Sequence, residues 1–220
     1  MLFHSLDRPA RQIQPGVAHL PNWLNASTQA ALVTEAREIA RSVAGTELAM
    51  KRPWVRGGQM SAYILSLGQH WHGRGYVQSL GGQRVPPIPE SLVTLARRAV
   101  REAAGVATEL VPWAGDFDPD VALINYYPPG SAMGMHVDAH EESSAPIVSF
   151  SLGDEALFRI GSDEAPRGPW SDLTLLSGDV VVFGGPARRA YHGVVAVREG
   201  TGPEFTGLSE GRINITVRQM

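Results

Sequence analysis

The sequence predicts an α+β protein that is mainly β, in which an antiparallel sandwich or jelly roll is flanked by two helices. Short apolar segments of β type follow one another from about residue 121 to the C-terminus, separated by turn residues and without a helix between them. Two amphipathic helical patterns lie upstream of these segments. The chain has 220 residues, which is long enough for one substantial core.

The two helices are predicted over residues 29–44 and 90–104. The first follows a capping residue, Asn25 or Ser27, carries apolar residues at helical spacing and stops at a glycine. The second begins after a proline-rich stretch and also ends at a glycine. Each pattern has one apolar face, so we expect the helices to pack on the outside of the β structure.

Seven strands are predicted in the C-terminal half, where glycine- and proline-rich turns separate the apolar segments. The stretch 51–85 is rich in glycine, arginine and aromatic residues and is typical of hairpins and loops. No internal repeat or linker divides the chain, so we expect a single domain over residues 1–220. The predicted strands are residues 121–126, 147–152, 156–160, 173–176, 179–183, 190–197 and 212–218.

Composition excludes several classes of function. There is no cysteine, which excludes disulfides, thiolate metal ligands and cysteine nucleophiles, so any metal must be held by His, Asp or Glu. The net charge of −3 argues against a protein that coats nucleic acid electrostatically. Residues 1–112 nevertheless hold 12 Lys and Arg against 7 Asp and Glu, whereas residues 113–220 hold 7 against 15. A basic substrate-facing half on an acidic metal-binding half would produce this asymmetry, and so would ordinary variation in surface charge.

The segments expected of a membrane protein are not found. No window approaches the roughly 18 to 20 apolar residues of a membrane span. The first residues lack the basic and then apolar pattern of a signal peptide. We therefore expect a soluble cytoplasmic protein with no membrane partner, and nothing in the sequence demands more than a monomer.

Three residues have the types and spacing of an iron site. His136 and Asp138 are two apart, so in an extended stretch both side chains point the same way and can reach one ion. His192 follows the apolar strand 179–183 after a Gly-Gly-Pro turn, which is consistent with an adjacent antiparallel strand. Two imidazoles and one carboxylate occupy one face of Fe(II) and leave the other open for a cosubstrate and O2. A chance H-x-D pair and a histidine that caps a turn are the alternatives.

The last predicted strand, 212–218, alternates strictly between polar and apolar residues. Arg212, Asn214 and Arg218 project to one side, and the isoleucines and valine between them project to the other. Arginine is suited to bidentate contact with carboxylates. Asn125 and Tyr127, two apart on their own strand, add uncharged hydrogen-bonding groups. These five residues could bind a five-carbon keto diacid, although a solvated edge strand would show the same alternation.

Taken together, these stretches resemble the AlkB family of Fe(II)/2-oxoglutarate dioxygenases over roughly residues 50–220. The ordered set of motifs is far more specific than any one of them. The segments that carry the resemblance are Leu123-Ile-Asn-Tyr-Tyr-Pro-Pro-Gly130, His136-Val-Asp138, Ala145-Pro-Ile-Val-Ser-Phe-Ser-Leu-Gly153, Gly178-Asp-Val-Val-Val-Phe-Gly-Gly185, Tyr191-His-Gly193 and Arg212-x-Asn-x-Thr-x-Arg218.

The resemblance implies a double-stranded β-helix, or jelly roll, with flanking N-terminal helices and a nucleotide-recognition lid. About residues 1–50 would form the N-terminal extension and helix, about 51–85 the lid, and about 110–220 the jelly-roll core. The implied cofactors are Fe(II), the cosubstrate 2-oxoglutarate and O2. The implied iron ligands are His136, Asp138 and His192, and the implied 2-oxoglutarate-binding residues are Asn125, Tyr127, Arg212, Asn214 and Arg218.

The resemblance also implies finer roles. Arg218 would bind the distal carboxylate of 2-oxoglutarate, and Arg212 would lie close to the cosubstrate and the reacting oxygen as a catalytic residue. In the lid, Trp71 would stack on the flipped base and Tyr76 would contact phosphate. Candidates for further contacts to the nucleic-acid backbone are Lys51, Arg52, Arg56, Arg74 and Arg84.

One position departs from the family pattern. Two residues after the metal Asp, the bacterial repair enzyme has a second Asp that contacts the exocyclic amine of the target base, and this chain has His140. A histidine there can accept a hydrogen bond or carry a positive charge, because its unperturbed pKa is about 6.5. We therefore expect a shifted base preference or pH optimum, with an ordinary exposed loop residue as the alternative.

The activity implied by the resemblance is oxidative demethylation of N-alkylated bases such as 1-methyladenine and 3-methylcytosine. Oxidation of the methyl group would release formaldehyde and restore the base, with succinate and CO2 as the other products. The partners would be single-stranded DNA, RNA or a flipped-out base of duplex DNA, because a base stacked in a duplex cannot enter a buried pocket. The alternatives are a dioxygenase of the same fold that acts on a protein or small molecule, and a non-catalytic β-sandwich binding module.

Overall fold

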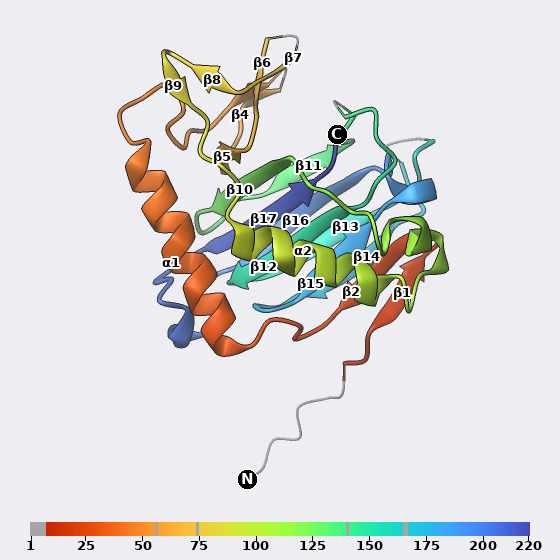
Figure 1. The fold of residues 1–220 in the computed structure, drawn as a ribbon. Coiled ribbons are helices and arrows are strands. Elements are labelled where there is room, and N and C mark those ends of the chain that lie inside the picture. Colours follow the sequence, from red (N-terminus) through yellow and green to blue (C-terminus); the bar gives the residue numbers. More distant parts are fainter. Residues whose placement is uncertain (1–7, 56, 74, 140, 165–166) are drawn as a thin grey trace.

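The chain folds as two packed antiparallel sheets covered on one side by two helices (Figure 1). In this computed structural model the described residues are 8–55, 57–73, 75–139, 141–164 and 167–220. The major sheet has the strand order β1-β2-β15-β12-β17-β10-β5, and the minor sheet has the order β11-β16-β13-β14. This arrangement is the jelly roll that was predicted.

From β10 onward the chain passes repeatedly between the two sheets. The major sheet consists of β1 (Arg11–Gln14), β2 (Val17–Leu20), β5 (Tyr63–Leu67), β10 (Val121–Tyr127), β12 (Ile147–Gly153), β15 (Val180–Phe183) and β17 (Arg212–Arg218). The minor sheet consists of β11 (Met133–His136), β13 (Glu155–Ile160), β14 (Ser171–Leu175) and β16 (His192–Arg198). Short 3-10 turns are η1 (Thr108–Trp113), η2 (Gly185–Ala187) and η3 (Glu204–Thr206).

Three small hairpins project from one end of the sandwich (Figure 1). They occupy most of the stretch 51–85 in which hairpins and loops were predicted. We call residues 51–85 the lid segment. Besides β5, which belongs to the major sheet, its strands form three hairpins: β3 (Trp54–Val55) with β4 (Gly58–Gln59), β6 (His70–His72) with β7 (Gly75–Val77), and β8 (Ser79–Leu80) with β9 (Gln83–Arg84).

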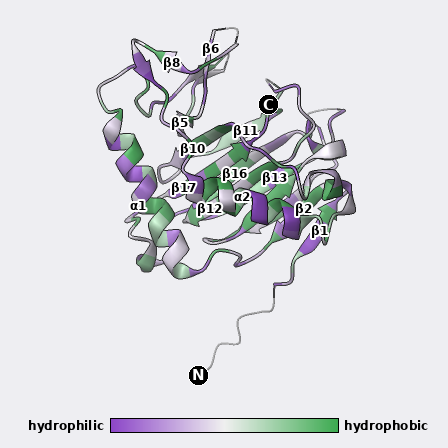
Figure 2. Cartoon of the chain, viewed as in Figure 1, coloured by the Kyte–Doolittle hydropathy of each residue, from purple (hydrophilic) through white to green (hydrophobic). Residues whose placement is uncertain are grey.

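The two helices are α1 (Ala26–Ser42) and α2 (Glu90–Ala103). The Asn25 side chain accepts a hydrogen bond from the backbone N–H of Thr28, which makes Asn25 the N-cap of α1. Both helices lie against the outer face of the major sheet, as predicted (Figure 1). Figure 2 shows hydrophobic residues concentrated in the sheets, whereas each helix also carries hydrophilic residues on the side away from them. Among the described residues, no helix is long and apolar enough to span a membrane.

Strand alternation divides the apolar residues between two cores. In β15, Val180 and Val182 join the core between the helices and the major sheet. Val181 and Phe183 point the other way and join the core between the two sheets. Because successive side chains of a strand face opposite sides, a strand that is buried on both faces reads as a continuous apolar run, and residues 180–183 have that pattern.

All seven predicted strands are confirmed, each within two residues at its ends, and both helices are confirmed within three. Sequence analysis missed β1 and β2. The N-terminal region was expected to be an extension and a helix, but these two strands continue the major sheet beyond β15. The strand β11 was also missed; sequence analysis placed a loop there.

A buried carboxylate fastens the N-terminal strands to the sheet. The Asp179 side chain is 0% exposed. It accepts hydrogen bonds from the guanidinium of Arg8 at 2.5 and 3.1 Å and from Nε2 of His19 at 3.1 Å. It also accepts from the backbone N–H groups of Asn22 at 2.8 Å and Leu176 at 3.0 Å. Burial alone would raise the pKa of this carboxyl, but these donors outweigh it and hold the pKa below its ordinary value of 3.8.

Replacement of Asp179 by Ala is therefore expected to lower the free energy of unfolding by about 3–5 kcal/mol at pH 7, because it leaves several buried donors without an acceptor. Urea denaturation followed by circular dichroism measures the change. The matched control is Asp172→Ala, which removes the exposed partner of Arg159 and should cost at most about 1 kcal/mol. Equal losses in the two variants would contradict the role given to Asp179.

The same contribution depends on pH in a defined direction. Because the folded-state pKa of Asp179 is depressed, its stabilisation is fully present above the ordinary value of 3.8 and is lost as the pH falls through the lower folded-state value. The difference in stability between wild type and Asp179→Ala should therefore narrow only at pH values below about 3.8. A difference that already narrows between pH 7 and pH 5 would contradict this assignment.

Candidate metal and cosubstrate site

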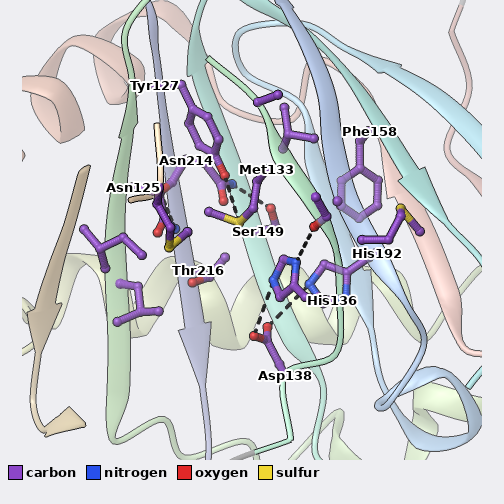
Figure 3. Close-up of a pocket in the computed structure, with 18 of the residues that line it drawn as sticks. Asn125, Tyr127, Met133, His136, Asp138, Ser149, Phe158, His192, Asn214 and Thr216 are labelled. Carbon is purple, nitrogen blue, oxygen red and sulfur yellow. Dashed lines mark hydrogen bonds and ion pairs between the residues drawn. The ribbon is translucent and has the colours of Figure 1, made fainter. Parts of the chain in front are cut away.

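The minor sheet brings the three predicted iron ligands together (Figure 3). His136 at the end of β11 and His192 at the start of β16 are cross-strand partners, and their ring centroids are 4.5 Å apart. Asp138 follows two residues after His136. Its carboxylate oxygens lie 3.8 Å from Nε2 of His136 and 3.5 Å from Nε2 of His192. One ligand atom from each residue lies within 4.8 Å of the others, so a single ion can contact all three.

Backbone carbonyls orient both imidazoles. The Nδ1 atom of His136 lies 2.9 Å from the carbonyl oxygen of Gly134, and Nδ1 of His192 lies 2.9 Å from that of Ala190. A carbonyl oxygen only accepts, so each Nδ1 carries the hydrogen and each Nε2 presents its lone pair toward the site. This hydrogen bond from the second ring nitrogen is the usual support of a metal-bound histidine.

The ionisation states also suit a divalent cation. Burial lowers the pKa of His136, and the neighbouring ring of His192 lowers it further, so the imidazole is held neutral. Burial would raise the pKa of Asp138, but Arg218 and His192 outweigh it and hold that pKa well below its usual range. The site therefore offers a neutral imidazole at His136 and a carboxylate at Asp138, and metal binding requires these protonation states.

A buried network of charged side chains supports Asp138. Nη2 of Arg218 lies 2.7 Å from Oδ2 of Asp138, and Nη1 of Arg218 lies 3.2 Å from Oε1 of Glu141. Arg188 donates to Glu141 at 3.0 Å and to the backbone oxygen of Asp138 at 2.8 Å. Glu141 also accepts a hydrogen bond from the Tyr76 hydroxyl in the lid segment. The network thus connects the lid segment to the metal ligand.

Strand β17 presents its polar face to the interior of the sandwich. Its neighbours are β10 and β12, in a register that pairs Asn214 with Asn125 and Ser151. The five residues expected to bind 2-oxoglutarate line one cavity of about 640 Å³ together with His136, Asp138 and His192. The amide of Asn214 donates to Ser149 at 2.7 Å. In Figure 3, Tyr127 and Asp138 lie at opposite ends of the group of labelled side chains.

Arg212 occupies the end of this cavity away from the metal ligands. Its side chain is 1% exposed and lies beside the ring of Tyr127. Gly211 adopts a φ of +75°, and a Cβ there would lie 2.4 Å from the carbonyl oxygen of Tyr127, so only glycine allows this close approach. Arg212 donates to Ser151 at 3.0 Å, but its Nε and Nη1 have no hydrogen-bond partner among the described residues.

A buried guanidinium without an anionic partner is costly unless a ligand supplies the negative charge. The donors of the cavity therefore fit a dicarboxylate that spans from the metal triad toward Arg212. Arg218 was expected at the distal carboxylate and Arg212 near the reacting oxygen. In the structure Arg218 contacts the candidate metal ligand Asp138, and Arg212 lies beside Tyr127 and donates to Ser151.

The residues expected to contact substrate are placed less completely. Trp71 and Tyr76 are cross-strand partners in the β6–β7 hairpin, with ring centroids 5.3 Å apart in an edge-to-face arrangement. The Tyr76 hydroxyl, expected to meet phosphate, is engaged by Glu141. His140 and the candidate phosphate contacts Arg56 and Arg74 lie outside the described residues.

Comparison with known proteins agrees with this geometry. Residues 16–218 match the family model of the 2OG-Fe(II) oxygenase superfamily. Alpha-ketoglutarate-dependent dioxygenase AlkB of Escherichia coli is 38% identical over 158 residues, which cover 70% of this chain and 67% of that protein. The chain belongs to the AlkB family of Fe(II)/2-oxoglutarate dioxygenases. Its cofactors are accordingly Fe(II), 2-oxoglutarate and O2, and the residues described above have the chemistry to hold them.

Two further relatives in the AlkB family span almost the whole chain. DNA N(6)-methyladenine demethylase ALKBH1C of Arabidopsis thaliana is 30% identical over 227 residues, which cover 94% of this chain and 49% of that protein. The solved structure of OsALKBH1 has a TM-score of 0.83 at 28% identity and covers 96% of this chain and 100% of that one. The chain thus spans about half the length of the Arabidopsis relative.

Sequence analysis missed the residues that support the AlkB-family site without touching the metal. Glu141 and Arg188 are both 2% exposed, and neither was singled out. The sequence carried no local signal for Glu141, because its burial beside Arg188 depends on a contact between residues 47 positions apart. Ser149 and Thr216 line the cavity as well, and their positions follow from the same strand alternation that revealed Asn214.

Loss of a metal ligand should abolish tight binding of a divalent cation. With Mn(II) as a redox-stable probe in isothermal titration calorimetry, His192→Ala is expected to weaken binding by at least about 100-fold, because removal of even a supporting group costs about 10- to 100-fold. The matched control is His72→Ala in the lid segment, which should bind Mn(II) as the wild type does. Equal weakening in both variants would contradict the assignment of His192.

Proposed function

We propose that the protein oxidatively demethylates N-methylated bases in nucleic acid, with single-stranded DNA as the first substrate to test and RNA as the second. The observation that carries the proposal is the arrangement of one cavity. A candidate metal-binding triad lies at one end. At the other lies the buried guanidinium of Arg212, two of whose nitrogens have no hydrogen-bond partner among the described residues, and a basic lid segment borders the cavity. The target bases are 1-methyladenine and 3-methylcytosine.

The volume of the cavity supports two occupants. About 640 Å³ is within the range of sites that bind drug-sized ligands, and a five-carbon dicarboxylate fills only part of it. The remaining space opens toward the lid segment, from which Val55, Gln59 and Met60 line the cavity. A flipped or unstacked base can approach the metal triad from that side, and Trp71 is the aromatic residue that we assign to stack on it.

We call the five residues proposed to bind 2-oxoglutarate the cosubstrate cradle, and each has a separate role. They are Asn125, Tyr127, Arg212, Asn214 and Arg218. Arg212 binds the distal carboxylate with the nitrogens that lack a protein partner. Asn125, Tyr127 and Asn214 provide uncharged hydrogen-bonding groups along the chain of the cosubstrate. Arg218 holds Asp138 in position and keeps it ionised, and it adds positive charge near the end of the cosubstrate that faces the metal.

When bound, Fe(II) would allow O2 to convert 2-oxoglutarate to succinate and CO2, and would couple this reaction to the insertion of an oxygen atom into a C–H bond of the N-methyl group. The resulting N-hydroxymethyl group breaks its N–C bond, releases formaldehyde and leaves N–H on the base. The protein groups orient the cosubstrate and hold the methyl group at the metal while the sandwich interior excludes water.

Two further observations support a nucleic-acid substrate. Residues 48–89 contain five Lys and Arg and no Asp or Glu, in a chain whose net charge is −3. Such a concentration of positive charge suits a phosphate backbone. Two relatives whose similarity covers 94% of this chain carry names that describe demethylation of N6-methyladenine in DNA. They also motivate the inclusion of N6-methyladenine among the test bases.

The deciding experiment is mass spectrometry of single-stranded oligonucleotides that each carry one 1-methyladenine, 3-methylcytosine or N6-methyladenine. They are incubated aerobically with protein, Fe(II), 2-oxoglutarate and ascorbate, and 2-oxoglutarate is omitted as a control. We expect loss of one methyl mass from at least one oligonucleotide in the complete mixture only. Succinate formation without loss of methyl would preserve the dioxygenase chemistry and move the substrate to a protein or small molecule.

The order of the arginines leads to a second test. Arg212→Ala is expected to raise the KM for 2-oxoglutarate by about 10- to 150-fold, which corresponds to the loss of about 1.5–3 kcal/mol from a charge-assisted hydrogen bond. Binding of Mn(II) in the absence of 2-oxoglutarate should remain unchanged. The matched control is Arg159→Ala, which removes an exposed arginine of β13 and should leave both quantities unchanged. A loss of Mn(II) affinity in Arg212→Ala would show that Arg212 acts at the metal after all.

A further inference from the structure

The lid segment exposes a tryptophan, Trp54, that belongs neither to the proposed iron site nor to the cosubstrate cradle. Trp54 is 78% exposed, and its neighbour Val55 is 54% exposed. Tryptophan is among the largest apolar side chains and is usually well buried. In the described part of the chain, none of the ring–ring or cation–π contacts involves Trp54. The indole ring therefore presents its faces to solvent.

The hairpin that carries this ring borders the cavity. Trp54 belongs to β3, and its cross-strand partner in the β3–β4 hairpin is Gln59. Gln59 and Val55 both line the cavity, as do the glycines between them. A molecule that enters the cavity with a chain extending from it must pass this hairpin. Trp54 is thus placed to contact the part of a substrate that stays outside the cavity.

The positive charge around Trp54 indicates that the molecule it contacts is a polyanion. Lys51 is exposed, and Arg52 is partly exposed next to it. Between residues 48 and 89 every charged side chain is basic, so the segment that carries Trp54 complements a polyanion. An exposed aromatic ring among basic residues is the combination with which proteins bind single-stranded nucleic acid, because the ring stacks on a base and the cations contact the phosphates.

We propose that Trp54 is a stacking platform for a base adjacent to the one in the cavity, so that the protein binds at least two consecutive nucleotides of a single strand. This inference rests on the proposed function and extends it. Trp71 would contact the reacting base, whereas Trp54 would contact its neighbour and would add affinity for a polynucleotide over an isolated nucleoside. Stacking places no hydrogen bond on the base, so the neighbour is bound without regard to its identity.

The test uses a single-stranded oligonucleotide with one 1-methyladenine flanked on either side, in separate probes, by the fluorescent base 2-aminopurine. Mn(II) replaces Fe(II) so that 2-oxoglutarate is bound without turnover. We expect the wild type to quench 2-aminopurine at one flanking position. Trp54→Ala should abolish this quenching and raise the Kd by about 5- to 150-fold, which is the range for the loss of one base–aromatic stack. Trp54→Phe should retain quenching and most of the affinity.

The matched control is Phe205→Ala, which removes an exposed aromatic of η3 beside α1, away from the lid segment. It should bind as the wild type does, and thermal melts should show that all variants remain folded. Wild-type affinity and quenching in Trp54→Ala would overturn the inference. So would a wild-type dimer in sedimentation that Trp54→Ala dissociates without a change in oligonucleotide affinity, because Trp54 would then cover a second copy of the chain.

The two proposals fail in different ways. If the wild type removes the methyl group but Trp54→Ala binds the oligonucleotide equally well, the stacking platform is wrong and the demethylase proposal stands. If the wild type binds none of the oligonucleotides, the proposed nucleic-acid substrate is itself wrong. Weaker binding in Trp54→Ala that Trp54→Phe reverses supports both.

Discussion

The register of strand β17 between β10 and β12 is the constraint on which the remainder of the site depends. Ile213, Ile215 and Val217 pack into the core beneath the helices, and the residues between them face the cavity. A slip of one residue would send every side chain of the strand to the opposite face, exchanging an apolar core for charged groups. Hydrophobic burial against α1 and α2 therefore determines where the arginines point. The cosubstrate cradle is positioned by a core with which it shares no side chain.

The metal triad depends on a second sheet and a different kind of support. His136 and His192 face each other across the minor sheet, and each ring is turned by a backbone carbonyl two residues earlier. Asp138 lies on no strand, so it is held by side chains, through Arg218 and the Arg188–Glu141 pair. The charges within this network offset one another, which is the condition under which buried ionic groups are tolerated. The major sheet thus positions the residues proposed to bind the cosubstrate, the minor sheet positions the two histidines proposed to bind the metal, and Arg218 of the major sheet contacts the third proposed ligand, Asp138.

The sequence predicts features that depend on neighbouring residues, and it does not predict features that depend on contacts between distant segments. Alternation in 212–218 and the spacing of His136 and Asp138 are local, and the side chains that they indicated line one cavity in the structure. The direction in which the cavity runs is not local. It depends on where the loop after β11 lies against β17, so the contact between Arg218 and Asp138 could not be predicted from the sequence. The strands β1 and β2 have four residues each, too short for a periodic pattern to stand out. Glu141 and Arg188 became visible only when the fold brought residues 47 positions apart into contact.

The cross-strand position of the two histidines ties the ion to the mechanics of the sheet. Strand β11 is the outer strand of the minor sheet, and its pairing with β16 is irregular between Met133 and His136. An edge strand with a broken ladder is the part of a sheet that opens most readily. An ion bound to His136 on one strand and His192 on the next would link the two strands where their hydrogen-bonded pairing is irregular. Loss of the ion would therefore destabilise β11 before the rest of the sandwich. Amide hydrogen exchange would become faster in β11 first.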